Sequence, residues 1–241
     1  HQRALHPNDV ISTDRFDDGI TGVVLANELL DNLPFRLMVW DGAWREAWVG
    51  HDAGRFLEVL RPADPQILET MGLPGTAPLG ARVPYQERAG QWVHDMLGRL
   101  RGRLVIVDYM VSATSDLAHR PWREWLRTFV GHERGGHYLI RPGEQDVTCD
   151  VCLDQLFHHA GRPDVEGTQS QFLERWGIAE LVDEGKRLWT ERAAHPDLEA
   201  IRMRSRISEA EALLDPSGLG AFRVVEFLGL RRAMGGSHLE N

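Results

Sequence analysis

Short apolar runs alternate with segments of helical periodicity along this chain of 241 residues. The first run, Gly-Val-Val-Leu-Ala at 22–26, holds only small or apolar residues and is typical of a buried parallel strand. The sequence then turns polar at Asn27 and Glu28, with Asp31 close behind and Pro34 closing the segment. Ligands of open α/β sheets bind beyond the carboxyl ends of the strands, so we expect a site at this turn. The same residues would also suit an ordinary helix start.

Other hydrophobic patterns predict a mixture of strands and helices. Alternating residues at 35–40 and 43–49 flank the pair Asp41-Gly42, which is a strong signal for a β-hairpin. We expect Asp150 to cap a helix at 150–161, or Thr148 to start it. Further strands are predicted at 103–109, 165–168 and 222–228, and further helices at 85–100, 169–176 and 180–214, the last broken by His195-Pro196.

Two segments lack a regular hydrophobic pattern. Residues 61–84 are rich in proline and glycine, which predicts a surface loop without regular structure. Residues 111–142 concentrate arginine, histidine and tryptophan, and we expect them to form a lid-like insertion, a protein-docking surface or a solvated face. Their local basic patch consists of Arg127, His132, Arg134, His137 and Arg141. We expect one α/β domain at 1–230 and a flexible tail at 231–241.

Composition narrows the class of protein. Hydrophobic residues make up 42% of the chain and charged residues 26%, as is usual for globular proteins. The net charge of −9 argues against a broad basic surface, so we expect no nucleic acid partner. No apolar run approaches the roughly 20 residues needed to cross a bilayer. Abundant arginine and alanine suggest a bacterial genome, and we expect a cytoplasmic protein.

The two cysteines form a Cys-x-x-Cys pair at Cys149 and Cys152. With His158 and His159 nearby, this pair could be half of a zinc site, or it could be a redox pair. No second Cys-x-x-Cys pair is present, and adjacent histidines on a helix diverge by about 100°. We therefore expect reduced, buried thiols and no bound metal.

A set of motifs, taken in order, resembles the MidA-type methyltransferase family, which is also known for its mitochondrial complex I assembly member. Two positions depart from the family pattern: Asn32 replaces the usual alanine, and Met110 stands where the family has glycine. The matching segments are Asn-Glu-Leu-Leu-Asp-Asn-Leu-Pro (27–34) with Trp-Arg-Glu (44–46), Tyr-Gln-Glu (85–87) before Trp92, Val-Ile-Val-Asp-Tyr (105–109), Pro-Gly-Glu-Gln-Asp-Val-Thr (142–148), Thr-Gln-Ser-Gln-Phe-Leu (168–173) with Gly-Ile (177–178), and Leu-Asp-Pro (214–216) with Gly-Ala-Phe-Arg-Val (220–224).

The resemblance implies a class I, S-adenosylmethionine-dependent methyltransferase. Its Rossmann-like α/β sheet would be mostly parallel with an antiparallel last strand, and it would carry helical insertions. The family's Gly-rich cofactor loop would lie upstream of residue 22, so we expect the N-terminal strands of a family member to be missing here. The implied acceptor is an arginine side chain of a protein partner, which for the mitochondrial member is a subunit of respiratory complex I.

The chemistry of the side chains and the family resemblance together indicate the candidate site residues. The resemblance implies an arginine acceptor; a carboxylate binds its planar guanidinium through two hydrogen bonds and a second carboxylate fixes its angle, so we expect Glu28 and Asp31 to hold it. Asn27 would hydrogen-bond the cofactor or the substrate, and the resemblance places Asp14 near the adenine of the cofactor. Further candidates for orienting the substrate or holding the turn are Asp108, Tyr109, Asp146 and Thr148.

A second interpretation comes from another functional class. The chain would then be a non-catalytic binding or assembly protein, which keeps the sheet and a docking surface but has no functional cofactor loop. The absence of a Gly-rich fingerprint before residue 22 favours this alternative.

Overall fold

The computed structural model describes residues 19–229, so Asp14 and the predicted tail at 231–241 lie outside the described residues. A four-stranded sheet forms its centre, in the order β1 (Ile20–Asn27), β6 (Leu100–Asp108), β13 (Arg223–Leu228) and β12 (Val165–Thr168). β1 and β6 are parallel, whereas β13 runs antiparallel to both of its neighbours. The predicted antiparallel last strand is confirmed. A mostly parallel sheet is not, because the sheet formed by residues 19–229 is mixed.

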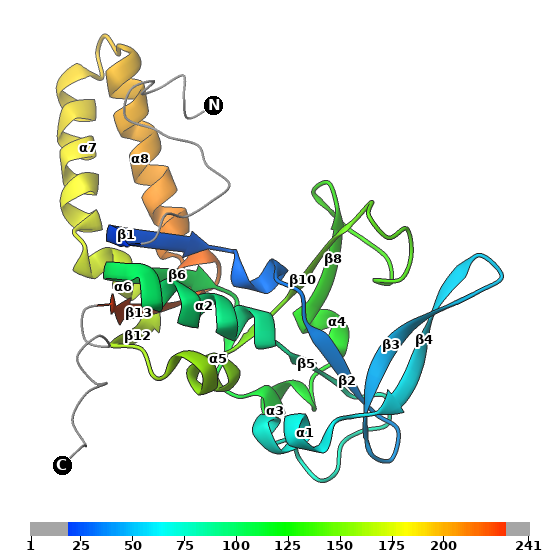
Figure 1. Cartoon of the computed structure of the whole chain (residues 1–241). Helices are drawn as coiled ribbons and strands as arrows, with labels where there is room; N and C mark the ends of the chain where they lie inside the picture. Colours follow the sequence, from blue (N-terminus) through cyan, green and yellow to red (C-terminus); the bar gives the residue numbers. More distant parts are fainter. Residues whose placement is uncertain (1–18, 230–241) are drawn as a thin grey trace, which may run out of the picture.

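Helices cover the two faces of the central sheet unequally. α2 (Glu87–Arg99) and α5 (Leu153–Ala160) pack on one face (Figure 1), where Ala26 and Ile106 join the main apolar core. On the other face, α6 (Gln169–Arg175) and the 3-10 turn η3 (Leu219–Ala221) leave part of β1 uncovered. Val23 and Leu25 are 68% and 64% exposed there. The run at 22–26 is therefore buried on only one face.

A second sheet is entirely antiparallel, in the order β4 (Arg55–Pro62), β3 (Trp44–Asp52), β2 (Arg36–Trp40) and β5 (Arg82–Tyr85). The predicted hairpin between β2 and β3 is confirmed, with Gly42 at φ 108° in its turn. The hairpin of β3 and β4 projects from the body of the protein (Figure 1).

The prediction of a structureless loop at 61–84 is wrong. This segment holds the end of β4, a short helix α1 (Pro65–Met71) and most of β5. Asp64 caps α1 by accepting a hydrogen bond from the Gln66 amide, and Pro65 occupies the first helical turn, where its missing N–H costs nothing. The prolines therefore start a helix here instead of preventing one.

The segment 111–152 forms a third layer from short elements. α3 (Thr114–Leu117) and α4 (Trp122–Trp125) precede a small antiparallel sheet, in the order β10 (Asp146–Cys149), β8 (Leu126–Val130) and β9 (Glu133–Arg134). β7 (Met110–Val111) pairs with β11 (Val151–Cys152). Two predictions fail here: Thr148 belongs to a strand and does not start a helix, and α5 begins at Leu153 without a side-chain cap from Asp150. Pairing with β8 holds residues 146–149 extended.

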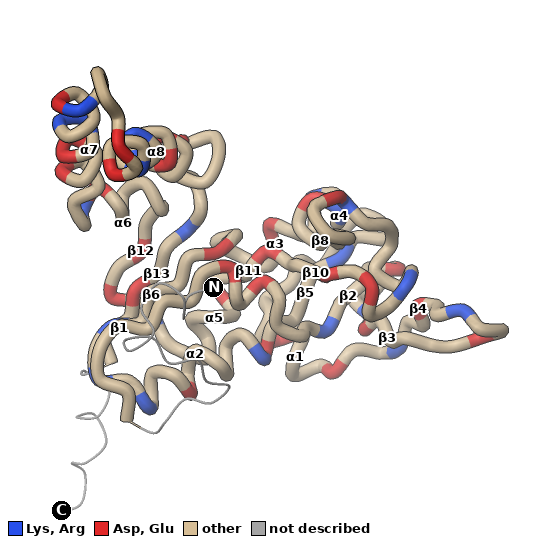
Figure 2. Tube along the Cα trace, turned by 90° about the horizontal axis from the view of Figure 1, so that it is seen from above, with Lys and Arg blue, Asp and Glu red and all other residues tan. Residues whose placement is uncertain are grey.

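Two long helices, α7 (Ile178–Arg192) and α8 (Leu198–Leu214), pack against each other as a projecting hairpin (Figure 1). Their predicted interruption at His195-Pro196 is confirmed. Charges of both signs lie along these helices (Figure 2), as expected for solvated surfaces. Within residues 19–229, none of the helices has the length and apolar character required to cross a membrane.

Candidate active site

The parallel strands β1 and β6 end side by side, and this edge carries the polar residues predicted from the sequence. Asn27 lies opposite Val107, and the Glu28 amide continues the ladder by donating to the Val107 carbonyl at 2.9 Å. Glu28 has a φ of 48°, in the left-handed region that residues other than glycine rarely adopt. Such strain is concentrated at functional sites, because the surrounding structure must hold it in place.

Asp108 holds the turn that follows β1. Its carboxylate accepts hydrogen bonds from the amides of Leu30 and Asp31 at 3.0 and 3.3 Å, and from the Tyr109 amide at 2.9 Å. The turn itself is a short 3-10 helix, η2 (Leu30–Asn32). One buried carboxylate on β6 therefore fixes the backbone that presents Glu28 and Asp31.

Burial shifts the ionisation of two carboxyl groups at this edge. Burial raises the pKa of Asp31 to about 6, and the charge of Glu28 adds to this, whereas Arg127 and Asn32 act in the opposite direction. Burial also raises the pKa of Asp108 to about 7, with a further contribution from the charge of Asp31. Both groups therefore titrate close to neutral pH, which is unusual for aspartate and typical of active sites.

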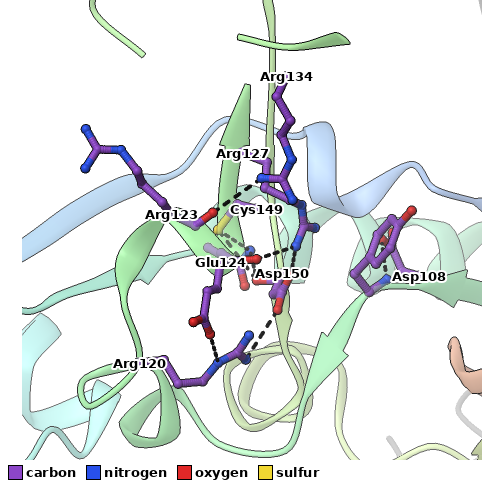
Figure 3. Close-up of polar contacts among 10 residues, drawn as sticks. Asp108, Arg120, Arg123, Glu124, Arg127, Arg134, Cys149 and Asp150 are labelled. Atoms are coloured by element: carbon purple, nitrogen blue, oxygen red, sulfur yellow. Dashed lines mark hydrogen bonds and ion pairs between the residues drawn. The ribbon is translucent and has the colours of Figure 1, made fainter. Parts of the chain in front are cut away.

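A second group of charges lies beside this turn. Arg127 donates to Asp150 at 2.7 Å, and Arg120 lies 3.6 Å from the other oxygen of Asp150 (Figure 3). The Arg127 guanidinium sits over the Tyr109 ring, 4.7 Å from its centroid. A cavity of about 530 Å³ opens at this place, and its lining includes Tyr109, Met110, Arg127, Asp150, Ser217, Leu219, Phe222 and Arg223.

The structure brings together most, but not all, of the residues predicted from the sequence. Asn27, Glu28, Asp31, Asp108 and Tyr109 gather at the ends of β1 and β6. Thr148 lies opposite Arg127 in the ladder of β8 and β10, so it borders the site. Asp146 lies two residues further along β10, opposite Phe129, where it is exposed.

Arg127 and Asp150 are functional candidates that the sequence analysis assigned elsewhere, to a basic patch and to a helix cap. Asp150 follows β10, the neighbour of β8 in the sheet, and lies 23 residues after Arg127, so no local pattern indicates their pairing. Gln86 is a second omission. It is buried, donates to the Asp150 carbonyl at 3.0 Å and accepts from the Cys152 amide at 2.8 Å. The position of Gln86 within the Tyr-Gln-Glu motif at 85–87 is the sequence signal that could have identified it.

The two cysteines are free and fully buried. Burial raises the pKa of both thiols well above the usual value, so they stay protonated at neutral pH. Across the part of the chain that the structure describes, no group of three His, Cys, Asp or Glu side chains is arranged to hold a metal ion.

Comparison with known proteins identifies relatives of this chain. Residues 5–167 match a family described as "Putative S-adenosyl-L-methionine-dependent methyltransferase". An uncharacterized protein from Burkholderia thailandensis has a similar crystal structure, with a TM-score of 0.75 and 25% identity, over 94% of this chain and 61% of that one. A second structure from the same organism, described as a "likely methyl transferase" bound to S-adenosyl-homocysteine, has a TM-score of 0.71 and 24% identity, over 95% of this chain and 62% of that one.

This chain therefore spans less than two thirds of the length of either solved relative. Among curated proteins, none matches it. The family match covers more than half of the chain and includes the strand ends that carry Glu28, Asp31 and Asp108. The resemblance stated from the sequence motifs is thus confirmed, and the chain belongs to this family of S-adenosyl-L-methionine-dependent methyltransferases.

Proposed function

We propose that the protein transfers a methyl group from S-adenosylmethionine to a side-chain nitrogen of arginine in a protein. The observation that carries this proposal is the pair of carboxyl groups, Glu28 and Asp31, on one strained turn at the carboxyl end of β1. Two acidic side chains on such a turn match the planar, cationic guanidinium group. Family membership and the S-adenosyl-homocysteine bound to the second relative support the choice of cofactor.

The residues at this edge also suit the cofactor. Asn27 is exposed at the end of β1, where ligands of α/β sheets bind, and it offers an amide to the cofactor's polar groups. The nearby acidic groups favour the positive charge of its sulfonium. When bound, the cofactor supplies an activated methyl group, so the protein has mainly to align donor and acceptor.

Each acidic residue then has a distinct part in the reaction. Glu28 holds the guanidinium by two hydrogen bonds and directs one nitrogen toward the methyl group. The bound cofactor would supply the methyl group, and Asp31 in its ionised form would accept the proton that the attacking nitrogen loses. Because the pKa of Asp31 is about 6, activity should rise with pH through that value. Asp108 does not touch the acceptor but fixes the turn through its three hydrogen bonds.

The test is methyl transfer from radiolabelled S-adenosylmethionine to peptides that contain arginine, with matched lysine peptides as the acceptor control. We expect Glu28→Gln to abolish transfer while its affinity for S-adenosyl-homocysteine stays within a few-fold of wild type. Glu69→Gln, which removes an exposed carboxylate on α1, is the matched control and should keep full activity. Full activity of Glu28→Gln, or equal transfer to lysine, would refute the assignment.

Calorimetric titration with S-adenosyl-homocysteine separates the enzyme from its alternative. Saturable binding with micromolar affinity supports the methyltransferase proposal. A folded protein that binds none would favour the non-catalytic binding or assembly role.

A further inference from the structure

A second, smaller cavity is lined by residues of the segment 122–137 and shares Arg127 with the cavity described above. Its volume is about 300 Å³, and it lies between α4, strands β8 and β9 and the glycines that follow β9. Its walls contain no aspartate or glutamate, which stands out in a protein of net charge −9. The lining residues are Trp122, Arg123, Leu126, Arg127, Thr128, Arg134, Gly135, Gly136 and His137.

The guanidinium groups of this pocket are held in place by aromatic rings. Arg134 lies over Phe129 at 5.6 Å, and Arg127 lies over Tyr109 at 4.7 Å. Arg134 also donates to the Arg123 carbonyl at 3.4 Å, which ties β9 to α4. Figure 3 shows the Arg127 and Arg134 side chains gathered above Asp150, whereas the Arg123 guanidinium points away from them. These ring contacts restrict the rotamers of Arg127 and Arg134, which lowers the entropy cost of binding.

The pocket has hydrogen-bonding capacity that the described residues do not use. Nη2 of Arg127 is buried and has no hydrogen-bond partner, although Nη1 of the same side chain binds both Asp150 and the Glu124 carbonyl. Neither Arg123 nor Arg134 forms an ion pair with any residue in 19–229. Among the described residues, Arg127 has one ion-pair partner in this region, Asp150, and Arg134 has none. The pocket therefore carries a local excess of positive charge.

Hydrogen bonds between β8 and the two glycines after β9 shape one wall of the pocket. The Gly135 amide donates to the Thr128 carbonyl at 2.7 Å, and the Thr128 hydroxyl donates to the Gly136 carbonyl at 2.7 Å. A Cβ atom at Gly135 would lie 2.6 Å from that hydroxyl oxygen, so only glycine allows this close approach. The wall is thus a built feature of the chain, formed by hydrogen bonds between β8 and the residues after β9.

We propose that this pocket binds an oxyanion, meaning a carboxylate or phosphate group, through Arg127 and Arg134 with Arg123 at its rim. Guanidinium groups bind such groups through paired, charge-assisted hydrogen bonds, and the unused Nη2 of Arg127 supplies a donor. The oxyanion belongs either to a small molecule or to an acidic side chain of the protein acceptor. Arg127 lines both cavities and its charge acts on Asp31, so an anion bound here would lie near the proposed methylation site.

The test measures binding directly and does not depend on methyl transfer. The full chain is titrated by calorimetry at low ionic strength with inorganic phosphate and, separately, with N-acetylglutamate. We expect saturable binding by the wild type, and affinity at least tenfold weaker in Arg134→Gln, which corresponds to about 1.4 kcal/mol. Arg61→Gln is the matched control, since Arg61 also lies over a ring, that of Trp48, but belongs to β4. Its affinity should equal that of the wild type.

Two results would overturn the proposal. One is the absence of saturable binding of either anion by the folded wild-type protein. The other is an equal loss in Arg134→Gln and Arg61→Gln, which would mean that net charge alone attracts the anion.

A pair of arginine peptides then identifies the source of the oxyanion. The two peptides differ only in glutamate or glutamine beside the arginine. Tighter binding of the glutamate peptide, lost in Arg134→Gln, would assign the oxyanion to the acceptor protein. Equal binding of the two peptides would exclude that source and assign the pocket to a small anion.

Discussion

Asp108→Asn tests how the turn after β1 is held and what the buried carboxyl group contributes. The Asp108 side chain is fully buried and accepts hydrogen bonds from the amides of Leu30, Asp31 and Tyr109. Asparagine has the same shape but only one acceptor atom, so at least one of these amides would face its NH₂ group. A buried donor without a partner costs about 1 to 3 kcal/mol. We expect the variant to be less stable than wild type by this amount at pH 5.

The same substitution removes an ionisation that makes wild-type stability depend on pH. Burial raises the pKa of Asp108 from its ordinary value of 3.8 to about 7. Between these values the folded protein keeps a proton that the unfolded chain has lost, so stability falls as the pH rises toward 7. From pH 5 the slope is about 1.4 kcal/mol per pH unit and falls to half of that at the folded pKa, so the loss up to pH 7 is about 2 kcal/mol. Asparagine does not ionise, so the variant escapes this loss.

The assay is urea unfolding followed by tryptophan fluorescence at pH 5 and at pH 7.5, with the free energy of unfolding extrapolated to water. Asp108→Asn should be the less stable protein at pH 5 and should equal or exceed the wild type at pH 7.5. Asp146→Asn, which changes an exposed carboxyl group on β10, is the control and should differ little from wild type at either pH. A stability difference for Asp108→Asn that is the same at both pH values would refute the reasoning.

Three further predictions concern other parts of the site and its support. Glu28→Gly should relieve the backbone strain at a φ of 48°, so we expect thermal unfolding to show about 1 kcal/mol more stability while methyl transfer is lost. A less stable variant would show that Glu28 is not strained. Gln86→Leu should leave the buried Cys152 amide without a partner, and the Asp150 carbonyl with only the Cys149 thiol at 3.5 Å, at a cost of about 1 to 3 kcal/mol in urea unfolding; a cost near zero would show that the amide finds another partner. Cys149 and Cys152 should react with a thiol reagent such as Ellman's far more slowly in the folded protein than in urea, and rapid reaction of the folded protein would contradict their burial.

The parts of the fold that the sequence predicted correctly are those with local patterns. The run at 22–26, the pair Asp41-Gly42 and the apolar run at 222–228 each carry their own signal, and each forms the predicted element. The helix at 65–71 was missed because proline was interpreted as a breaker, although Asp64 followed by Pro65 is a common helix start.

The parts that could not be predicted depend on contacts between distant residues. Residues 146–149 are extended because β8 pairs with them, and β8 lies almost twenty residues earlier in the chain. The pairing of Arg127 with Asp150 depends on that same ladder. The motif Asn-Glu-x-x-Asp located the turn itself, but only the fold shows that Asp108 holds it.

The exposed aliphatic side chains of β1 have a consequence for how this polypeptide behaves in solution. Within residues 19–229, β1 is an edge strand, and Val23 and Leu25 present a water-exposed apolar surface beside its open edge. Such an edge is a template for contact between molecules, whereas a net charge of −9 on each chain keeps them apart. Added salt screens this repulsion without weakening the apolar contact. We therefore expect the polypeptide to be most soluble at low ionic strength and to self-associate through β1 as salt is added.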